Sequence, residues 1–140
     1  VLFRSIILFK NAKVLKMNKK IFINLTNHIS TYWSEKQKDA AKLLGEIVDM
    51  PFPQIEKSAD ENYISMLADE YLQKILHIAK NTRVTIHLMG EQTFVYALLK
   101  RLRKNDIECV ASTTKRIVTT DSSGQKKEVI FQFERFRKYE

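Results

Sequence analysis

The sequence contains a single cysteine, Cys109, which falls in a predicted strand. One chain therefore has no means of forming a disulfide or a thiolate metal site, which fits a reducing, cytoplasmic location. We expect Cys109 to be a buried structural thiol. No apolar run approaches the 18 or so residues that a membrane span requires, so we expect a soluble globular protein rather than a membrane protein.

Several catalytic signatures are also missing. The absence of Walker A, G-x-G-x-x-G and G-x-S-x-G sequences argues against P-loop NTP hydrolysis, dinucleotide redox chemistry and α/β-hydrolase catalysis. His28, His77 and His87 fall in a predicted loop, helix and strand, with no H-x-x-x-H spacing and no carboxylate at ligand spacing. We therefore expect neither a metal nor a cofactor.

The first sixteen residues require separate treatment. Residues 1–5 read Val-Leu-Phe-Arg-Ser, which is the translation of a common sequencing-adapter tail, so we interpret 1–16 as a non-native leader and Met17 as the natural start. A secretory signal is the competing interpretation, but the apolar run is short and no small-residue cleavage site follows. Without this leader 20 basic residues face 16 acidic ones, and the formal charge falls from +8 to +4. Charge alone then gives little reason to expect a polyanion-binding protein.

The remaining chain, 17–140, is long enough for one domain with a core. Apolar and β-branched runs alternate with helical periodicity, which predicts parallel strands with right-handed crossovers. The predicted elements are strands over 21–25, 46–50, 83–89 and 107–111, helices over 34–44, 58–76 and 91–104, and a hairpin of 116–120 with 127–136. The expected fold class is α/β: a small Rossmann-like three-layer sandwich with about four parallel strands, helices on both faces and a C-terminal antiparallel hairpin.

Three polar clusters directly follow predicted strands. Because loops after parallel strands emerge at one edge of a sheet, we expect these clusters to share a rim. Hydroxyl and amide groups, a glycine at a strand-to-helix turn and a nearby arginine suit a phosphate-bearing ligand. The candidate binding residues are Thr26, Ser30, Gly90, Glu91, Gln92, Thr93, Ser112, Thr113 and Thr114. The candidate catalytic residues are Asn27, His28 and Arg116.

Simpler interpretations stay open for each cluster. Glu91 and Thr93 lie where side chains cap a helix, and Thr113 and Thr114 are residue types that favour strands. His28 in a polar loop is also typical of a solvated side chain. The joint occurrence of the clusters at equivalent strand ends favours a site.

The predicted hairpin carries apolar residues on both faces, with Val129, Phe131 and Phe133 on one and Ile130 and Phe136 on the other. Core packing explains one face, and a symmetric partner would explain the other. The hairpin is therefore compatible with a two-fold dimer.

On three segments the chain resembles the small CRISPR-associated proteins with Rossmann-like folds, which include CARF-type sensors of cyclic oligoadenylate and compact ring nucleases. The segments are Ile21 to His28, His87 to Phe94 and Cys109 to Arg116, and the resemblance extends over 20 to about 137. It implies a homodimer that holds a cyclic tetra- or hexa-adenylate and degrades it in CRISPR-linked antiviral signalling.

In similar proteins a ribose 2′-hydroxyl attacks the neighbouring phosphate without a metal and leaves a 2′,3′-cyclic phosphate. The resemblance implies that residues 90–93 hold a phosphate, that Arg116 neutralises it, and that Asn27 and His28 activate or orient the attacking hydroxyl. These families share no catalytic signature that can be matched here, so the catalytic roles are assigned by position alone.

Three other functions compete with this one. A non-enzymatic module would sense a nucleotide or dock a partner through the aromatic hairpin. A nucleic-acid-binding protein would use the basic helix end at 100–104, although cations there also complement the helix terminus, and we do not expect a long nucleic acid as partner. An enzyme acting on a phosphorylated small molecule would need an acidic metal-binding pair, and only Asp49 ends a strand.

Overall fold

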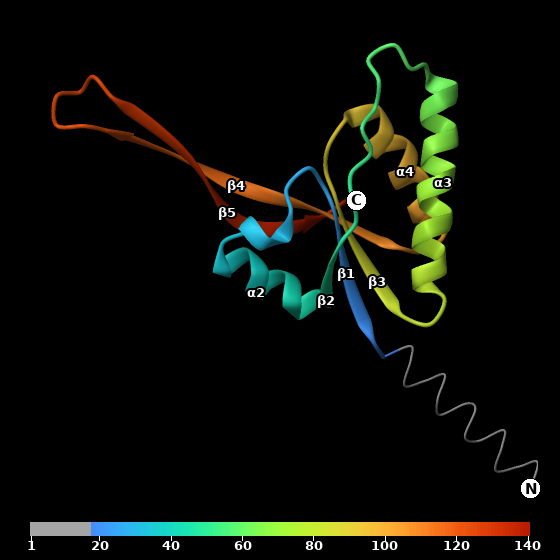
Figure 1. The fold of residues 1–140 in the computed structure, drawn as a ribbon. Helices are drawn as coiled ribbons and strands as arrows, with labels where there is room; N and C mark the ends of the chain where they lie inside the picture. Colours follow the sequence, from blue (N-terminus) through green and yellow to red (C-terminus); the bar gives the residue numbers. More distant parts are fainter. Residues whose placement is uncertain (1–17) are drawn as a thin grey trace, which may run out of the picture.

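A computed structural model describes residues 18–140, so the predicted leader lies outside the described residues. The chain forms an α/β fold around one five-stranded sheet (Figure 1). The strands are β1 (Lys20–Leu25), β2 (Glu46–Asp49), β3 (Arg83–Leu88), β4 (Glu108–Thr120) and β5 (Lys127–Lys138). The helices are η1 (Ser30–Tyr32), α2 (Glu35–Leu44), α3 (Glu61–Ala79) and α4 (Gln92–Lys104).

The sheet has the order β2-β1-β3-β4-β5, in which the first four strands are parallel and β5 is antiparallel to β4. Four parallel strands and a C-terminal hairpin were predicted, and both are confirmed. From β1 the chain leads to β2, toward one edge of the sheet, and from β3 it leads to β4, toward the other edge. The loops that follow β1 and β3 therefore diverge, which is the arrangement that leaves a crevice at the carboxyl edge of an open parallel sheet.

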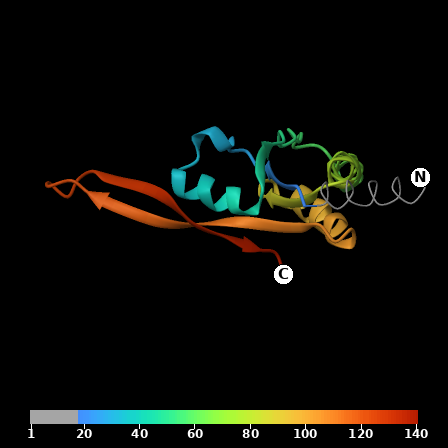
Figure 2. The same cartoon turned by 90° about the horizontal axis from the view of Figure 1, so that it is seen from below.

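Apolar residues cover both faces of the sheet. Alternate residues of β1 and β3, such as Ile23 and Ile86, belong to a cluster with α3 and α4. The residues between them, such as Phe22, pack with Trp33 and Ala41 beside α2. Figure 2 accordingly shows α2 on one side of the sheet and α3 and α4 on the other.

Side-chain caps begin α2 and α3, although α3 begins at Glu61 and not at the predicted residue 58. Ser34 accepts a hydrogen bond from the Gln37 amide at 3.2 Å, and Asp60 accepts one from the Tyr63 amide at 3.0 Å. Such caps satisfy amide groups that have no partner inside the helix. They fix the points at which the chain leaves the carboxyl edge of the sheet.

One prediction of the chain path is wrong. Residues 112–116 were expected to form a turn after a strand that ends at Ala111, but they lie inside the continuous strand β4. Each of them pairs with β5, from Ser112 opposite Phe136 to Arg116 opposite Phe131. The β-branched threonines favour this extended conformation over a turn.

The hairpin also differs in which side chains share a face. The register shifts between Thr113 and Thr114, which leaves Glu134 as the extra residue of a β-bulge. A bulge changes the alternation of faces by one residue. Phe133 and Phe136 were predicted on opposite faces, but their rings lie 4.9 Å apart between centroids.

Beyond the bulge, residues 114–133 form a two-stranded arm that projects from the body (Figures 1 and 2). β4 pairs with β3 only from Glu108 to Val110, so the arm has no third strand. Val118, Ile130 and Phe131 of the arm are exposed.

Candidate functional site

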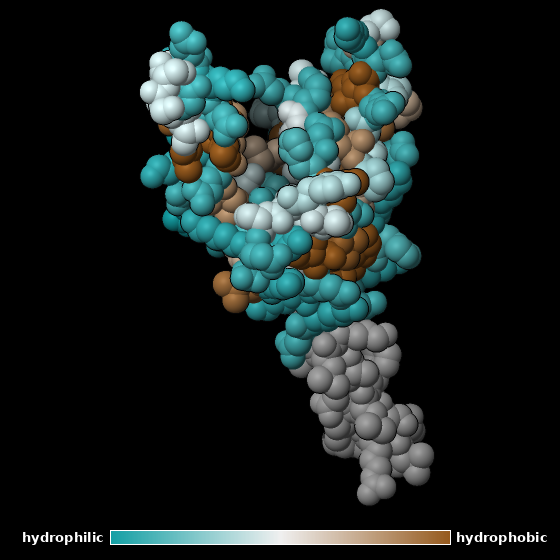
Figure 3. Space-filling model, turned by 60° about the vertical axis from the view of Figure 1, so that its left-hand side comes forward, coloured by the Kyte–Doolittle hydropathy of each residue, from teal (hydrophilic) through white to brown (hydrophobic). Residues whose placement is uncertain are grey.

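The loops after β1 and β3 and the middle of β4 surround a cavity of about 470 Å³. Its lining includes Thr26, Asn27, His28, Gly90, Ser112 and Thr114, which come from all three of the predicted polar clusters. The space-filling view shows the surface hollowed between two raised parts at this end of the molecule (Figure 3). Hydroxyl and amide groups from distant parts of the sequence therefore meet at the carboxyl edge of the sheet.

The other six candidate residues do not line this cavity. Gln92 and Thr93 belong to the start of α4, and the Thr113 hydroxyl donates to the Arg135 carbonyl at 3.2 Å. Arg116 pairs with Phe131, which does line the cavity, so it lies on the same face of the arm two pairs beyond Thr114. Arg116 is thus close to the rim but outside the lining.

Glu91 occupies the place that was assigned to a phosphate. Its carboxylate accepts hydrogen bonds from the Thr93 amide at 3.1 Å and the Phe94 amide at 2.8 Å, and the Thr93 hydroxyl donates to it at 2.7 Å. The Thr93 hydroxyl and the Phe94 amide hold the pKa of Glu91 below its ordinary value. The start of α4 is therefore capped by its own chain, and an anion would have to displace a carboxylate to bind there.

Gly90 serves close packing at this turn. A Cβ atom added at Gly90 would lie 2.3 Å from the ring of Phe52, which packs edge-on against Phe94 at 5.3 Å between centroids. The residue thus lets the loop after β2 cover the end of β3.

A buried polar network lies beneath the cavity and is centred on Asn24, which is 1% exposed. The Asn24 amide nitrogen donates to the Asp49 carboxylate at 2.7 Å and to the His28 carbonyl at 2.8 Å. Ser30 donates to the same carboxylate through its amide at 3.0 Å and its hydroxyl at 2.7 Å. Burial alone would raise the pKa of Asp49, but the hydrogen bonds from Asn24 and Ser30 outweigh it and keep the pKa below its ordinary value. Asp49 and Ser30 therefore support the loop that carries His28.

This network fixes the protonation of His87. The His28 carbonyl and the Asp49 carboxylate are both acceptors, so the Asn24 side-chain atom between them is the amide nitrogen. The Asn24 oxygen therefore points the other way and lies 3.1 Å from His87 Nδ1. Only a protonated Nδ1 makes a hydrogen bond there, and neutral histidine then carries a bare acceptor at Nε2. Thr26 completes the arrangement, because its hydroxyl donates to the same Asn24 oxygen at 2.9 Å.

His87 lines the cavity although it is only 3% exposed. Burial and the nearby His28 lower its pKa from 6.5 to about 4, so the ring is neutral at physiological pH. Within residues 18–140, His87 Nε2 is the only buried side-chain nitrogen or oxygen that has no hydrogen-bond partner in the protein.

Aromatic rings form the remaining wall. Trp33 and Phe131 line the cavity, and the ring of His87 lies 5.5 Å from Trp33 and 5.1 Å from Phe136 between centroids. Among residues 18–140, no carboxylate, lysine or arginine belongs to the lining. The cavity therefore offers neutral hydrogen-bonding groups and flat apolar surfaces, which suit a heterocyclic ligand with hydroxyl groups.

Sequence reasoning missed these rings and His87 as site residues. A signal for His87 is present, because it is a histidine inside the apolar run of a predicted central strand, where a polar side chain needs a partner. Trp33 and Phe131 carry no such signal, since any buried or exposed aromatic residue would look the same in the sequence.

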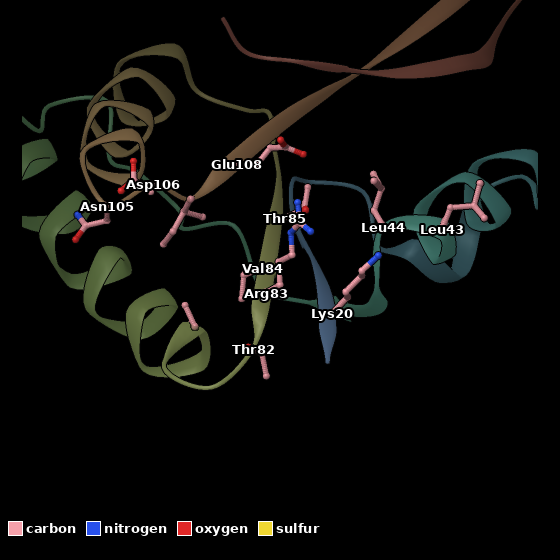
Figure 4. A pocket seen from close by; sticks show the side chains of 12 residues that line it. Lys20, Leu43, Leu44, Thr82, Arg83, Val84, Thr85, Asn105, Asp106 and Glu108 are labelled. Atoms are coloured by element: carbon pink, nitrogen blue, oxygen red, sulfur yellow. The ribbon is translucent and has the colours of Figure 1, made fainter. Parts of the chain in front are cut away.

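A second hollow, of about 380 Å³, lies at the opposite edge of the sheet (Figure 4). Lys20, Arg83 and Glu108 reach it from the amino ends of β1, β3 and β4. Ligands of open parallel sheets bind at the carboxyl ends instead, and within the described residues this hollow holds no buried polar atom that lacks a partner. We therefore take the carboxyl-edge cavity as the candidate site.

Two further observations apply to the part of the chain that the structure describes. No three side chains among its His, Cys, Asp and Glu residues are grouped so that they could hold a metal ion. None of its helices has the length and apolar character needed to cross a membrane. Cys109 is free and 3% exposed, and its burial raises the pKa of the thiol to about 12, as expected for a structural residue.

A family model described as the Uncharacterized protein MJ1673 family matches residues 20–137, which include the whole cavity lining and all of the sheet except Lys138. No curated protein and no solved structure gives a significant match.

Proposed function

We propose that this chain, which belongs to the Uncharacterized protein MJ1673 family, binds a cyclic oligoadenylate at the carboxyl-edge cavity and cleaves it without a metal ion. The observation that carries the proposal is the meeting of hydroxyl, amide, histidine and aromatic side chains in one cavity. We assign the fold to the small Rossmann-like three-layer sandwiches, an assignment supported by the strand order and by apolar clusters on both faces of the sheet.

The lining suits a nucleotide in two ways. Phe131, which is 64% exposed, offers a face on which an adenine base can stack, an interaction worth about 1–3 kcal/mol per base, and Trp33, which is 8% exposed, adds an apolar wall. Thr26, Asn27 and Thr114 offer neutral donors and acceptors for ribose and phosphate oxygens, and Arg116 lies two residue pairs further out along the hairpin. A neutral lining with Arg116 outside it favours an orientation in which the nucleosides enter the cavity and the phosphates stay near Arg116.

Cleavage then proceeds by attack of a ribose 2′-oxygen on the adjacent phosphorus. The O2′–P bond forms, the P–O5′ bond breaks, the leaving 5′-oxygen takes a proton from water, and the products end in a 2′,3′-cyclic phosphate and a 5′-hydroxyl. His28 is exposed beside the cavity and is our candidate to take the 2′-hydroxyl proton, since histidine exchanges protons near neutral pH. Asn27 would orient the hydroxyl, and Arg116 would stabilise the charge that develops on the phosphate.

A homodimer would match the ligand. Isolated two-stranded ribbons are marginally stable in water, and the arm exposes Ile130 on one face and Phe131 on the other. A second copy would cover these residues, and a two-fold axis would bring two cavities to one cyclic ligand. Sedimentation of the wild-type protein is expected to give the mass of two chains, with the equilibrium shifted toward one chain in Ile130→Ser.

Incubation of the pure protein with labelled cyclic tetra- and hexa-adenylate in EDTA tests cleavage. We expect linear products that carry a 2′,3′-cyclic phosphate, and a loss of rate of at least about tenfold in His28→Ala. His77→Ala is the matched control, because His77 is exposed on α3 and does not line the cavity. An intact ring together with the absence of binding would contradict the proposal.

The alternative is a non-enzymatic nucleotide-sensing or partner-docking module. It is favoured by the lining itself, in which no carboxylate supports His28 as a base. Such a module would bind the same rings without turnover, and His28→Ala would change the affinity alone. A cytoplasmic location and a role in CRISPR-linked antiviral signalling belong to either version of the proposal.

A further inference from the structure

His87 is the buried polar residue of the cavity that the proposed chemistry leaves unused. It is 97% buried, since only 3% of its surface is exposed, yet it contributes to the cavity lining. A buried acceptor without a partner is costly, and in native proteins such groups meet an ordered water, an ion or a ligand. The question is which chemical group fits this nitrogen.

The partner of His87 Nε2 has to be a hydrogen-bond donor. Asp49 and the His28 carbonyl orient the Asn24 amide, and the Asn24 oxygen in turn requires the proton on His87 Nδ1. This chain of hydrogen bonds leaves only a lone pair at Nε2. An acceptor such as a phosphate oxygen is therefore excluded from this position.

The donor also has to be small and neutral. The rings of Phe22, Trp33 and Phe136 surround His87 at 6.1, 5.5 and 5.1 Å between centroids. An ammonium group would lose its hydration among these rings without a counter-charge, because no carboxylate lines the cavity. A hydroxyl group meets both requirements.

We propose that His87 Nε2 accepts a hydrogen bond from a ribose 2′-hydroxyl of the bound nucleotide and thereby makes the cavity specific for ribonucleotides. This inference rests on the proposed function, since it assumes that the ligand is a nucleotide. His87 acts in recognition and positioning, because it holds a 2′-hydroxyl of the ring other than the one that attacks, while His28 remains the candidate base for the attacking hydroxyl.

The test uses fluorescence of Trp33, the single tryptophan of the chain, which itself lines the cavity. Cyclic tetra-adenylate and its all-2′-deoxy counterpart are titrated into the wild type, His87→Phe and the control His77→Ala. We expect the wild type and the control to bind the ribose ring about tenfold more tightly than the deoxy ring, and His87→Phe to bind both at the deoxy level.

Equal affinity of the wild type for the two rings, or discrimination that survives in His87→Phe, would overturn the inference and leave the proposed function intact. If the wild type instead loses affinity when the ring lacks the adenine 6-amino group, the donor to His87 belongs to the base. That result would also overturn the inference. If neither ring binds the wild type, the proposed function fails and the inference fails with it.

A second measurement does not depend on how the variant folds. Nitrogen NMR of the histidine-labelled wild type is expected to show His87 with the proton on Nδ1 and with Nε2 unprotonated. On addition of cyclic tetra-adenylate the Nε2 resonance is expected to shift toward a hydrogen-bonded value. A proton found on Nε2 in the free protein would overturn the inference.

Discussion

His87 makes the protein sensitive to mild acid. Its pKa is about 4 in the folded protein and 6.5 in an unfolded chain, so between these values the unfolded chain binds a proton that the folded protein does not. The free energy of unfolding is therefore undiminished above pH 6.5, and it falls as the pH drops from 6.5 to about 4. A pKa difference of about 2.5 corresponds to a loss of roughly 3 kcal/mol over this interval.

Urea denaturation at several pH values between 7.5 and 4 measures this loss, with Trp33 fluorescence as the probe. The matched variant His87→Gln removes the titrating group, whereas the acids whose pKa values are lowered, such as Asp49 and Glu91, titrate in both proteins. We therefore expect the stability of the wild type to fall by roughly 3 kcal/mol more than that of His87→Gln, with most of the difference gained between pH 6.5 and 4.

The exposed histidines serve as controls. His77→Ala should follow the wild-type curve, and His28→Ala should follow it closely, because His28 makes only the second contribution to the lowered pKa, after burial. Parallel curves for the wild type and His87→Gln would refute the reasoning, since they would mean that His87 is as easily protonated in the folded protein as in the unfolded chain.

The remaining predictions concern the cap, the buried network and the arm. Glu91→Ala removes the cap of α4 and should lower the free energy of unfolding by about 1 kcal/mol in urea denaturation, with ligand affinity unchanged; a gain in affinity for inorganic phosphate would instead restore the helix start as an anion site. Asp49→Ala leaves the Asn24 and Ser30 donors without their acceptor and should cost about 1–3 kcal/mol, whereas a neutral result would show that water replaces the carboxylate. Phe131→Ser, at a residue that is 64% exposed, should change the stability by less than about 0.5 kcal/mol but weaken nucleotide binding by about 1–3 kcal/mol; equal affinity in calorimetry would remove Phe131 from the site.

Much of the fold follows from local patterns in the sequence. The alternation of apolar strands and amphipathic helices gives the four parallel strands, and the caps at Ser34 and Asp60 place the starts of α2 and α3. The position of the polar loops after β1 and β3 at one edge of the sheet then follows from the rule for open parallel sheets. These features depend on periodicity and on the side-chain chemistry of single turns, which a sequence records directly.

The wrong predictions concern segments whose conformation depends on pairing between strands. Residues 112–116 resemble a polar turn, yet pairing with β5 makes them part of a continuous strand. A bulge at Glu134 moves Phe136 to the face of Phe133. His87 was missed for a related reason, because its bare nitrogen results from a partner, Asn24, that is 63 residues away in the sequence. Such long-range partners leave no local periodicity.

The decisive experiment is calorimetric titration with cyclic tetra-adenylate in EDTA of the wild type and of His28→Ala, in which cleavage is expected to be at least about tenfold slower. The account predicts saturable binding with one ring for every two chains, and a marked loss of affinity when the ring lacks its 2′-hydroxyl groups. Absence of saturable heat with either cyclic tetra- or hexa-adenylate would contradict the claim that this cavity receives a nucleotide ring.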